Sequence, residues 1–201
     1  YQIGQALIEN DSVRLSDDDM AFVQARHGGL EYDDFIERTF EGIYFTREEN
    51  RWLDLVCQNI PRMSCPHRRA LAWFAVFQSA MIKRPYNLFH RGNLYMRLAN
   101  VQRTFGNKAT WEGSFADYFR RFANQASDAV LNTGGVCRAS CADAMDIEGN
   151  FDLVYVDTPY IKCNRVGTDY HAFYHFLEGM VRYGEWAGSI DHRFKHLPLR
   201  D

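Results

Sequence analysis

Residues 151–160 read Phe-Asp-Leu-Val-Tyr-Val-Asp-Thr-Pro-Tyr, and this stretch decides the expected fold. The apolar run 153–156 is typical of a short buried strand. The run ends in an acid, a rigid proline turn and an aromatic ring. In open α/β sheets, ligands bind beyond the carboxyl ends of the strands, so we expect residues 157–160 to lie at a ligand site.

Outward from this stretch, the chain reads mainly as helix. Ser16 before three acids, and Thr46 before Glu48 and Glu49, are helix-start patterns. The helix expected at 67–83 is apolar nearly all round, which predicts a central position. Apolar spacing predicts helices at about 1–9, 17–26, 47–60, 67–83, 114–131 and 171–183, loops with short strands at 84–113, and another strand at 136–139. Strand, turn, strand, loop and helix in the last third predict one edge of a parallel α/β sheet.

The composition indicates a protein with a packed core and no membrane span. The 201 residues carry a net charge of −3, with 46% hydrophobic and 15% aromatic residues, enough for a packed core. No apolar run approaches the length of a membrane span. The chain opens with Tyr1 and has no signal-like segment, so we expect a fragment. Five cysteines without a secretory signal predict reduced thiols in the cytoplasm, and their spacing predicts no metal site.

Between residues 83 and 108 the chain is basic and contains no acid. One interpretation is a solvated basic face. The other is contact with DNA phosphates, because such a cluster gains affinity by releasing counterions. Interleaved aromatic residues favour the nucleic-acid interpretation. The candidate contacts in this stretch are Lys83, Arg84, Arg91, Arg97, Arg103 and Lys108.

The turn after the apolar run carries the candidate catalytic chemistry. The Asp157 carboxylate and the main-chain carbonyl of Thr158 could accept both protons of an amino group on a planar ring. Pro159 would fix the turn, and Tyr160 would stack on a base flipped out of the duplex. The alternative is a structural Asp-x-Pro turn, in which the acid only caps the turn.

Several stretches together resemble the Dam-like DNA adenine methyltransferases. They are Ala6–Asn10, Glu41–Asn50, Lys83–Phe89, Arg103–Lys108, Asp152–Tyr160 and Phe173–Glu178. The resemblance implies a Rossmann-like α/β sheet with a mainly helical target-recognition insertion. It also implies double-stranded DNA as partner, S-adenosylmethionine as methyl donor and the exocyclic amino group of a flipped adenine as acceptor.

The resemblance also assigns residues. Residues 157–160 match the catalytic motif, with Thr158 where the family has proline. Asp143 and Asp157 match cofactor-binding positions, although Asp143 could instead cap the following turn. The loop after the motif adds Lys162 and Arg165 as candidate DNA contacts.

Two features of the family are missing from this sequence. The glycine-rich cofactor loop is not found, and Gly28-Gly29 is a poor substitute. The late strands after the last expected helix are also missing. We therefore expect the middle and catalytic portion of such an enzyme, with the missing remainder as a possible partner.

The expected organisation has three parts: 1–66, a helical part; 67–131, the central helix with the basic insertion; and 132–201, the catalytic part. Two alternatives to an adenine methyltransferase stay open. The chain could be an inactive DNA-binding remnant or half of a split enzyme. It could also methylate RNA or a glutamine amide.

Overall fold

Helices make up most of the structure, a computed structural model that describes residues 1–10, 12–100, 108–132, 134–157, 161–162, 165–166 and 169–200. The longer helices begin and end close to the predicted positions. The helices are α1 (Gln2–Ile8), α2 (Asp17–Gln24), α3 (Phe35–Thr39), α4 (Arg47–Asn59), α5 (Pro66–Ile82), α6 (Leu94–Leu98), α7 (Lys108–Glu112), α8 (Phe115–Asp128), α9 (Tyr170–Val181) and α10 (Trp186–Ser189). Short 3-10 turns lie at Ile60–Arg62, Pro85–Asn87 and Ala144–Asp146. No helix in the described part is both long and apolar enough to cross a membrane.

Both predicted capping signals form. The Ser16 hydroxyl accepts from the Asp19 amide at 3.1 Å, and the Asp19 carboxylate accepts from the Ser16 amide at 2.9 Å. At α4 the Thr46 hydroxyl accepts from the Glu49 amide at 3.3 Å, and the Glu49 carboxylate accepts from the Thr46 amide at 2.8 Å. These reciprocal bonds satisfy amide groups that have no partner within the helix, so both helices start where the sequence indicates.

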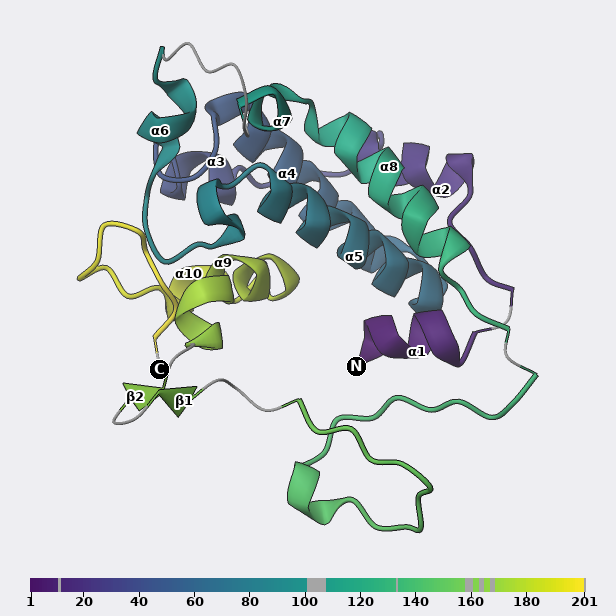
Figure 1. The fold of residues 1–201 in the computed structure, drawn as a ribbon. Helices are drawn as coiled ribbons and strands as arrows, with labels where there is room; N and C mark the ends of the chain where they lie inside the picture. The colour runs from purple at the N-terminus through teal and green to yellow at the C-terminus, as the bar shows by residue number, and fades with distance from the viewer. Residues whose placement is uncertain are drawn as a thin grey trace.

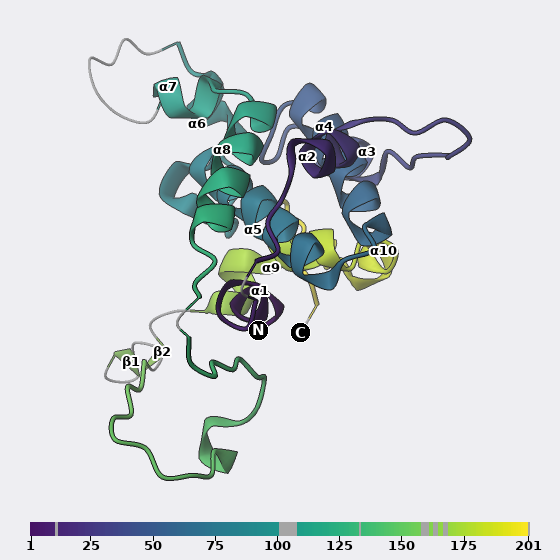
Figure 2. The same cartoon turned by 90° about the vertical axis from the view of Figure 1, so that its right-hand side faces the viewer.

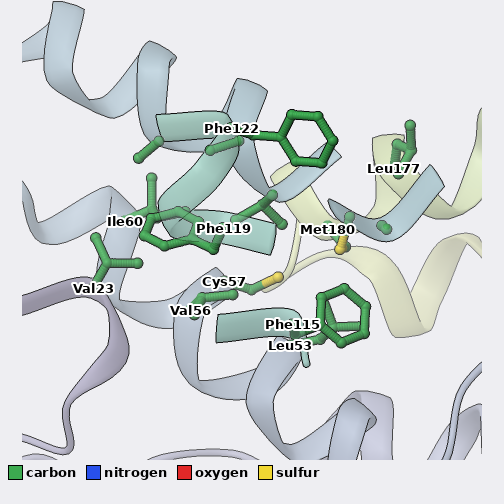
Figure 3. Packing of buried hydrophobic residues seen from close by; sticks show 14 of the residues in the cluster. Val23, Leu53, Val56, Cys57, Ile60, Phe115, Phe119, Phe122, Leu177 and Met180 are labelled. Atoms are coloured by element: carbon green, nitrogen blue, oxygen red, sulfur yellow. The ribbon is translucent and has the colours of Figure 1, made fainter. Parts of the chain in front are cut away.

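The predicted central helix α5 packs mainly against α8 and α1 (Figure 1). Its buried side is lined with small and branched residues, which lets neighbouring helices approach closely. Figure 3 shows side chains from α2, α4, α8 and α9, including Val23, Val56, Phe119 and Met180, in the apolar interior. The opposite side of α5 is only half-buried at Trp73, Phe74 and Phe77.

A cluster of aromatic rings ties α9 to the loops after α3 and α5. Phe176 of α9 is fully buried, and its ring stacks on Phe89 with centroids 5.1 Å apart. The Phe176 ring also meets Phe40 edge-on at 5.0 Å and Tyr44 at 5.1 Å. These contacts join residues that are more than 80 positions apart in sequence, and they hold α9 against the rest of the helical body.

The predicted α/β sheet is not found in the described part of the chain. The strands found in the described residues are two short segments, β1 (Ile161–Lys162) and β2 (Arg165–Val166). They are antiparallel and pair Ile161 with Val166 and Lys162 with Arg165. Residues 136–139 are not a strand, and Val136 is 88% exposed. The Rossmann-like fold class predicted from the sequence is therefore wrong for this structure.

The apolar run 153–156 also differs from its prediction. Leu153, Val154, Tyr155 and Val156 are 86%, 64%, 86% and 67% exposed, in irregular chain without strand pairing. Both ribbon views show residues 134–157 looping away from the helices (Figures 1 and 2). Apolarity predicts burial only where another segment covers the run, and no described segment does so.

The basic stretch contains helix where loops and short strands were predicted. Its described residues form the 3-10 turn at 85–87 and helices α6 and α7. Each is one or two turns long, which is too short to show a helical period in the sequence. The predicted division at residues 66 and 131 stays a prediction.

Candidate catalytic turn and basic stretch

Asp157, the first residue of the predicted catalytic turn, is exposed at the end of the irregular segment 134–157. Thr158, Pro159 and Tyr160 lie outside the described residues. The carboxylate is accessible to a ligand, while the geometry of the turn and the position of the aromatic ring stay predictions.

Asp143, the other predicted cofactor contact, caps its own 3-10 turn. Its carboxylate accepts from the Met145 amide at 2.9 Å, which is the capping role considered as the alternative. Neither Asp143 nor Asp157 lines the cavities that lie beside α1, α5 and α9. Both acids are exposed on a segment with few contacts to the helices, so the two predicted cofactor contacts lie outside these cavities.

Two predicted DNA contacts, Lys83 and Arg97, are buried instead. Lys83 Nζ pairs with Glu49 Oε1 at 2.8 Å and donates to the carbonyls of Trp111, at 2.8 Å, and Gly113. The Arg97 guanidinium binds both Glu49 oxygens, at 2.6 and 2.8 Å, and the Trp111 carbonyl at 3.0 Å. The positive charges of Lys83 and Arg97 are therefore neutralised inside the protein by Glu49.

Arg84, a third predicted DNA contact, is fully buried. It donates to the carbonyls of Leu88 at 3.2 Å and Arg91 at 2.8 Å, and its guanidinium lies 4.5 Å from the centroid of the Tyr44 ring. Burial lowers its pKa to about 9. The buried Arg84 side chain therefore fixes the backbone of the loop 85–92 by hydrogen bonds to two of its carbonyls. We remove Lys83, Arg84 and Arg97 from the predicted phosphate contacts, because buried side chains present no charge to DNA.

Arg91 remains an exposed candidate on that loop. Lys108 is about one-third exposed, lies 3.8 Å from Glu112 and donates to the Ala99 carbonyl at 3.4 Å. Arg103 lies outside the described residues. Lys162 and Arg165 lie in β1 and β2, and their side chains are outside the described part.

The loop also presents aromatic side chains to solvent. Tyr86 is 73% exposed and has φ +63°, and Asn87 has φ +58°. Left-handed backbone is uncommon for tyrosine, so the surrounding contacts must hold this conformation. Tyr95 on α6 is 72% exposed. Arg91 and these rings provide charge and stacking surface on the same part of the chain.

Glu49 has a second role that the sequence did not predict, as the counter-charge of two buried cations. The sequence indicated it as a helix cap, which it is, but the same carboxylate also neutralises Lys83 and Arg97. Burial alone would raise the pKa of Glu49, but hydrogen bonds from Arg97 and Lys83 outweigh burial and lower it. The helix-start pattern identified the residue, whereas only tertiary contacts bring the two cations to it.

Metal chemistry finds no support in the described residues, where no group of three His, Cys, Asp or Glu side chains could hold an ion. The cysteines at 57, 65 and 141 are free thiols. Burial raises the pKa of Cys57 well above its usual value. Cys163 lies outside the described residues.

No protein-family model matches the chain, and no solved structure matches it significantly. The chain is similar to the type II methyltransferase M2.HphI of Haemophilus parahaemolyticus, with 28% identity over 204 residues. That alignment covers 96% of this chain and 58% of the relative, so the chain spans less than two-thirds of the relative's length. The similarity supports the predicted relationship to methyltransferases, and it does not single out the adenine-specific class.

Proposed function

We propose that this chain is the DNA-binding and adenine-holding portion of a site-specific DNA adenine methyltransferase. The observation that carries the proposal is the similarity to a type II methyltransferase along 96% of the chain, in a sequence that contains Asp157-Thr-Pro-Tyr160. The exposed position of Asp157 supports it, because a carboxylate that holds a substrate amine must be reachable.

Methylation of an adenine amino group requires the turn to bind the amino group and to stack on the base. An adenine amino group is a weak nucleophile because its lone pair is delocalised into the ring. Hydrogen bonds from its two protons to the Asp157 carboxylate and the Thr158 carbonyl would favour a pyramidal, more nucleophilic nitrogen. Stacking on Tyr160 would offset the few kcal/mol that base flipping costs.

The methyl donor implied by the resemblance is S-adenosylmethionine, which supplies an electrophilic methyl group when bound. The predicted cofactor contacts Asp143 and Asp157 do not line the cavities beside α1, α5 and α9, so the proposal gives this chain the acceptor side of the reaction. For DNA contact the supporting residues are Arg91, Lys108, Tyr86 and Tyr95, which present charge or aromatic surface.

The test is transfer of labelled methyl from S-adenosylmethionine to unmethylated duplex DNA, followed by nucleoside mass spectrometry. The chain is assayed alone and mixed with a polypeptide comprising the two-fifths of M2.HphI that the alignment leaves uncovered. Asp157→Ala removes the proposed amine contact. Asp152→Ala is the matched control, because Asp152 is also exposed on the same segment.

Label on adenine that disappears in Asp157→Ala and persists in Asp152→Ala is the expected result. Label on cytosine would show that the adenine assignment is wrong. Absence of label in both preparations would remove the proposal that this chain takes part in methyl transfer.

A DNA-binding chain without methyl transfer is the second candidate. The poor fit of Asp143 and Asp157 to a cofactor pocket favours it. It predicts duplex binding by fluorescence anisotropy with no heat of binding for S-adenosylmethionine in calorimetry.

A further inference from the structure

A small cavity lies between the start of α4 and the helices α6 and α7. Its volume is about 290 Å³, and its lining includes Thr46, Glu49, Arg97, Lys108, Trp111 and Glu112. Thr46 is the N-cap of α4, a helix of 13 residues. The cavity is therefore at the N-terminal end of that helix, where the helix dipole favours a negative charge.

Two N–H donors of the lining have no acceptor. Arg97 Nε and Trp111 Nε1 are buried, and neither makes a hydrogen bond within the described part of the chain. The two residues are 8% and 7% exposed. The terminal nitrogens of Arg97 already bind Glu49 and two backbone carbonyls, so the guanidinium is fixed in place. Buried donors without an acceptor destabilise a protein, and an acceptor bound in the cavity would satisfy both.

The charges around the cavity also favour an anion. The Glu49 carboxylate is neutralised by Lys83 at 2.8 Å and by Arg97 at 2.6 Å. Lys108 adds a third cation, whose side chain is 35% exposed. Its partner Glu112 is 3.8 Å away and 66% exposed, so water screens that pair. Three cations and two carboxylates leave a surplus of positive charge at this cavity.

We propose that the cavity binds a phosphate group through Arg97 Nε, the indole N–H of Trp111 and the Lys108 ammonium. The oxygens of a phosphate dianion are all acceptors, and the three groups offered to it are all donors. Its tetrahedral shape lets separate oxygens meet donors that come from different elements, α6 and α7.

A phosphate group can belong to a free ion, to a small ester or to the DNA backbone. The donors of Arg97 and Trp111 are buried, and a duplex backbone is too bulky to follow them into a cavity of this size. We therefore assign the cavity to free phosphate or a small phosphate ester. This site is separate from the proposed adenine contact at Asp157.

The experiment titrates the full ¹⁵N-labelled chain with inorganic phosphate at constant ionic strength, in a buffer free of phosphate. Proton–nitrogen spectra follow the indole N–H signals, which single Trp→Phe variants assign. We expect a saturable shift of the Trp111 signal, with the signals of Trp52, Trp73 and Trp186 unchanged. A parallel titration with a short duplex of mixed sequence tests the DNA backbone as the source.

Calorimetry with inorganic phosphate then compares variants. Trp111→Phe and Lys108→Gln should each weaken binding by about tenfold, because each removes a hydrogen bond to a charged group. Trp73→Phe and Lys195→Gln are the matched controls, at a half-buried and an exposed position outside the cavity, and should bind as the unchanged chain does. Lys108 is partly exposed, so Lys108→Gln should keep the helix content in far-UV circular dichroism even if Trp111→Phe does not fold.

Absence of a phosphate-dependent shift at Trp111 would overturn the proposal. An equal shift with chloride, or equal affinity in Lys108→Gln and the unchanged chain, would also overturn it. A Trp111 shift caused by the duplex and not by inorganic phosphate would assign the cavity to the DNA backbone instead. No methyl donor is present, so the outcome is separate from that of the proposed methyl transfer.

Discussion

The Glu49 carboxylate is the counter-charge of two buried cations, Lys83 and Arg97, so the stability of the fold depends on its negative charge. Glu49→Gln keeps the size but leaves Lys83 and Arg97 without a counter-charge in positions that are 1% and 5% exposed. We expect the free energy of unfolding to fall by about 3 kcal/mol, the typical cost of breaking a buried ion pair. Urea unfolding measures the change.

The control for this change is Glu48→Gln, at an exposed neighbouring position. It should alter the free energy of unfolding by less than about 0.5 kcal/mol. Equal unfolding midpoints for the two variants would contradict the role of Glu49 as the counter-charge.

His175 makes stability depend on pH. Its side chain is fully buried, and burial lowers its pKa to about 4, although Nε2 lies 3.1 Å from the Phe89 carbonyl. The unfolded chain takes up this proton near pH 6.5, so the stability that neutral His175 contributes is present above pH 6.5. It is lost as the pH falls toward 4, by roughly 3 kcal/mol in total.

The prediction for His175 is checked by urea unfolding at pH 7, 5.5 and 4.5. His175→Gln should flatten the decline in stability between these pH values. His192→Gln, at an exposed position, should keep the decline of the unchanged chain. A decline as steep in His175→Gln as in the unchanged chain would assign it to other groups.

At the scale of elements, the loop 85–92 combines a buried support with an exposed surface. Arg84 holds the loop through the Leu88 and Arg91 carbonyls, while Tyr86 and Arg91 face solvent. Tyr86→Ala should weaken the binding of single-stranded DNA by about tenfold through lost base stacking. Arg91→Ala should reduce the salt dependence of binding by about one phosphate contact.

Fluorescence anisotropy with single-stranded DNA measures the first effect, and anisotropy with duplex DNA at several salt concentrations measures the second. Phe194→Ala and Arg14→Ala are the matched controls, since both positions are exposed and lie outside this loop. If the loop variants bind DNA as the controls do, the DNA surface lies elsewhere on the molecule.

At the scale of the whole molecule, a helical body carries one long irregular segment, residues 134–157, which loops away from the helices (Figures 1 and 2). Limited chymotrypsin digestion should cut first after Phe151, Leu153 or Tyr155, which are exposed outside that body. The two products should stay together, because Phe176 of α9 packs against Phe40 and Phe89 from the first product.

A single peak in native gel filtration, two bands on a denaturing gel and unchanged helix content would confirm this organisation. Early cleavage within α4 or α5, or separation of the products, would contradict it.

The sequence by itself determined the parts of this protein that depend on near neighbours. The caps at Ser16 and Thr46 form from residues three positions apart, and the apolar spacing of α5 and α8 follows from one helical period. Local geometry is enough to specify these features, so the long helices were predicted correctly.

Tertiary structure alone decided which residues are covered. The cations Lys83, Arg84 and Arg97 read as a DNA surface but are buried. Glu49, far away in sequence, pairs with Lys83 and Arg97, and Arg84 donates to the carbonyls of Tyr44, Leu88 and Arg91. The run 153–156 reads as a buried strand but is exposed, because no described segment pairs with it. Burial depends on contacts between residues far apart in sequence, and neither charge nor apolarity specifies those partners.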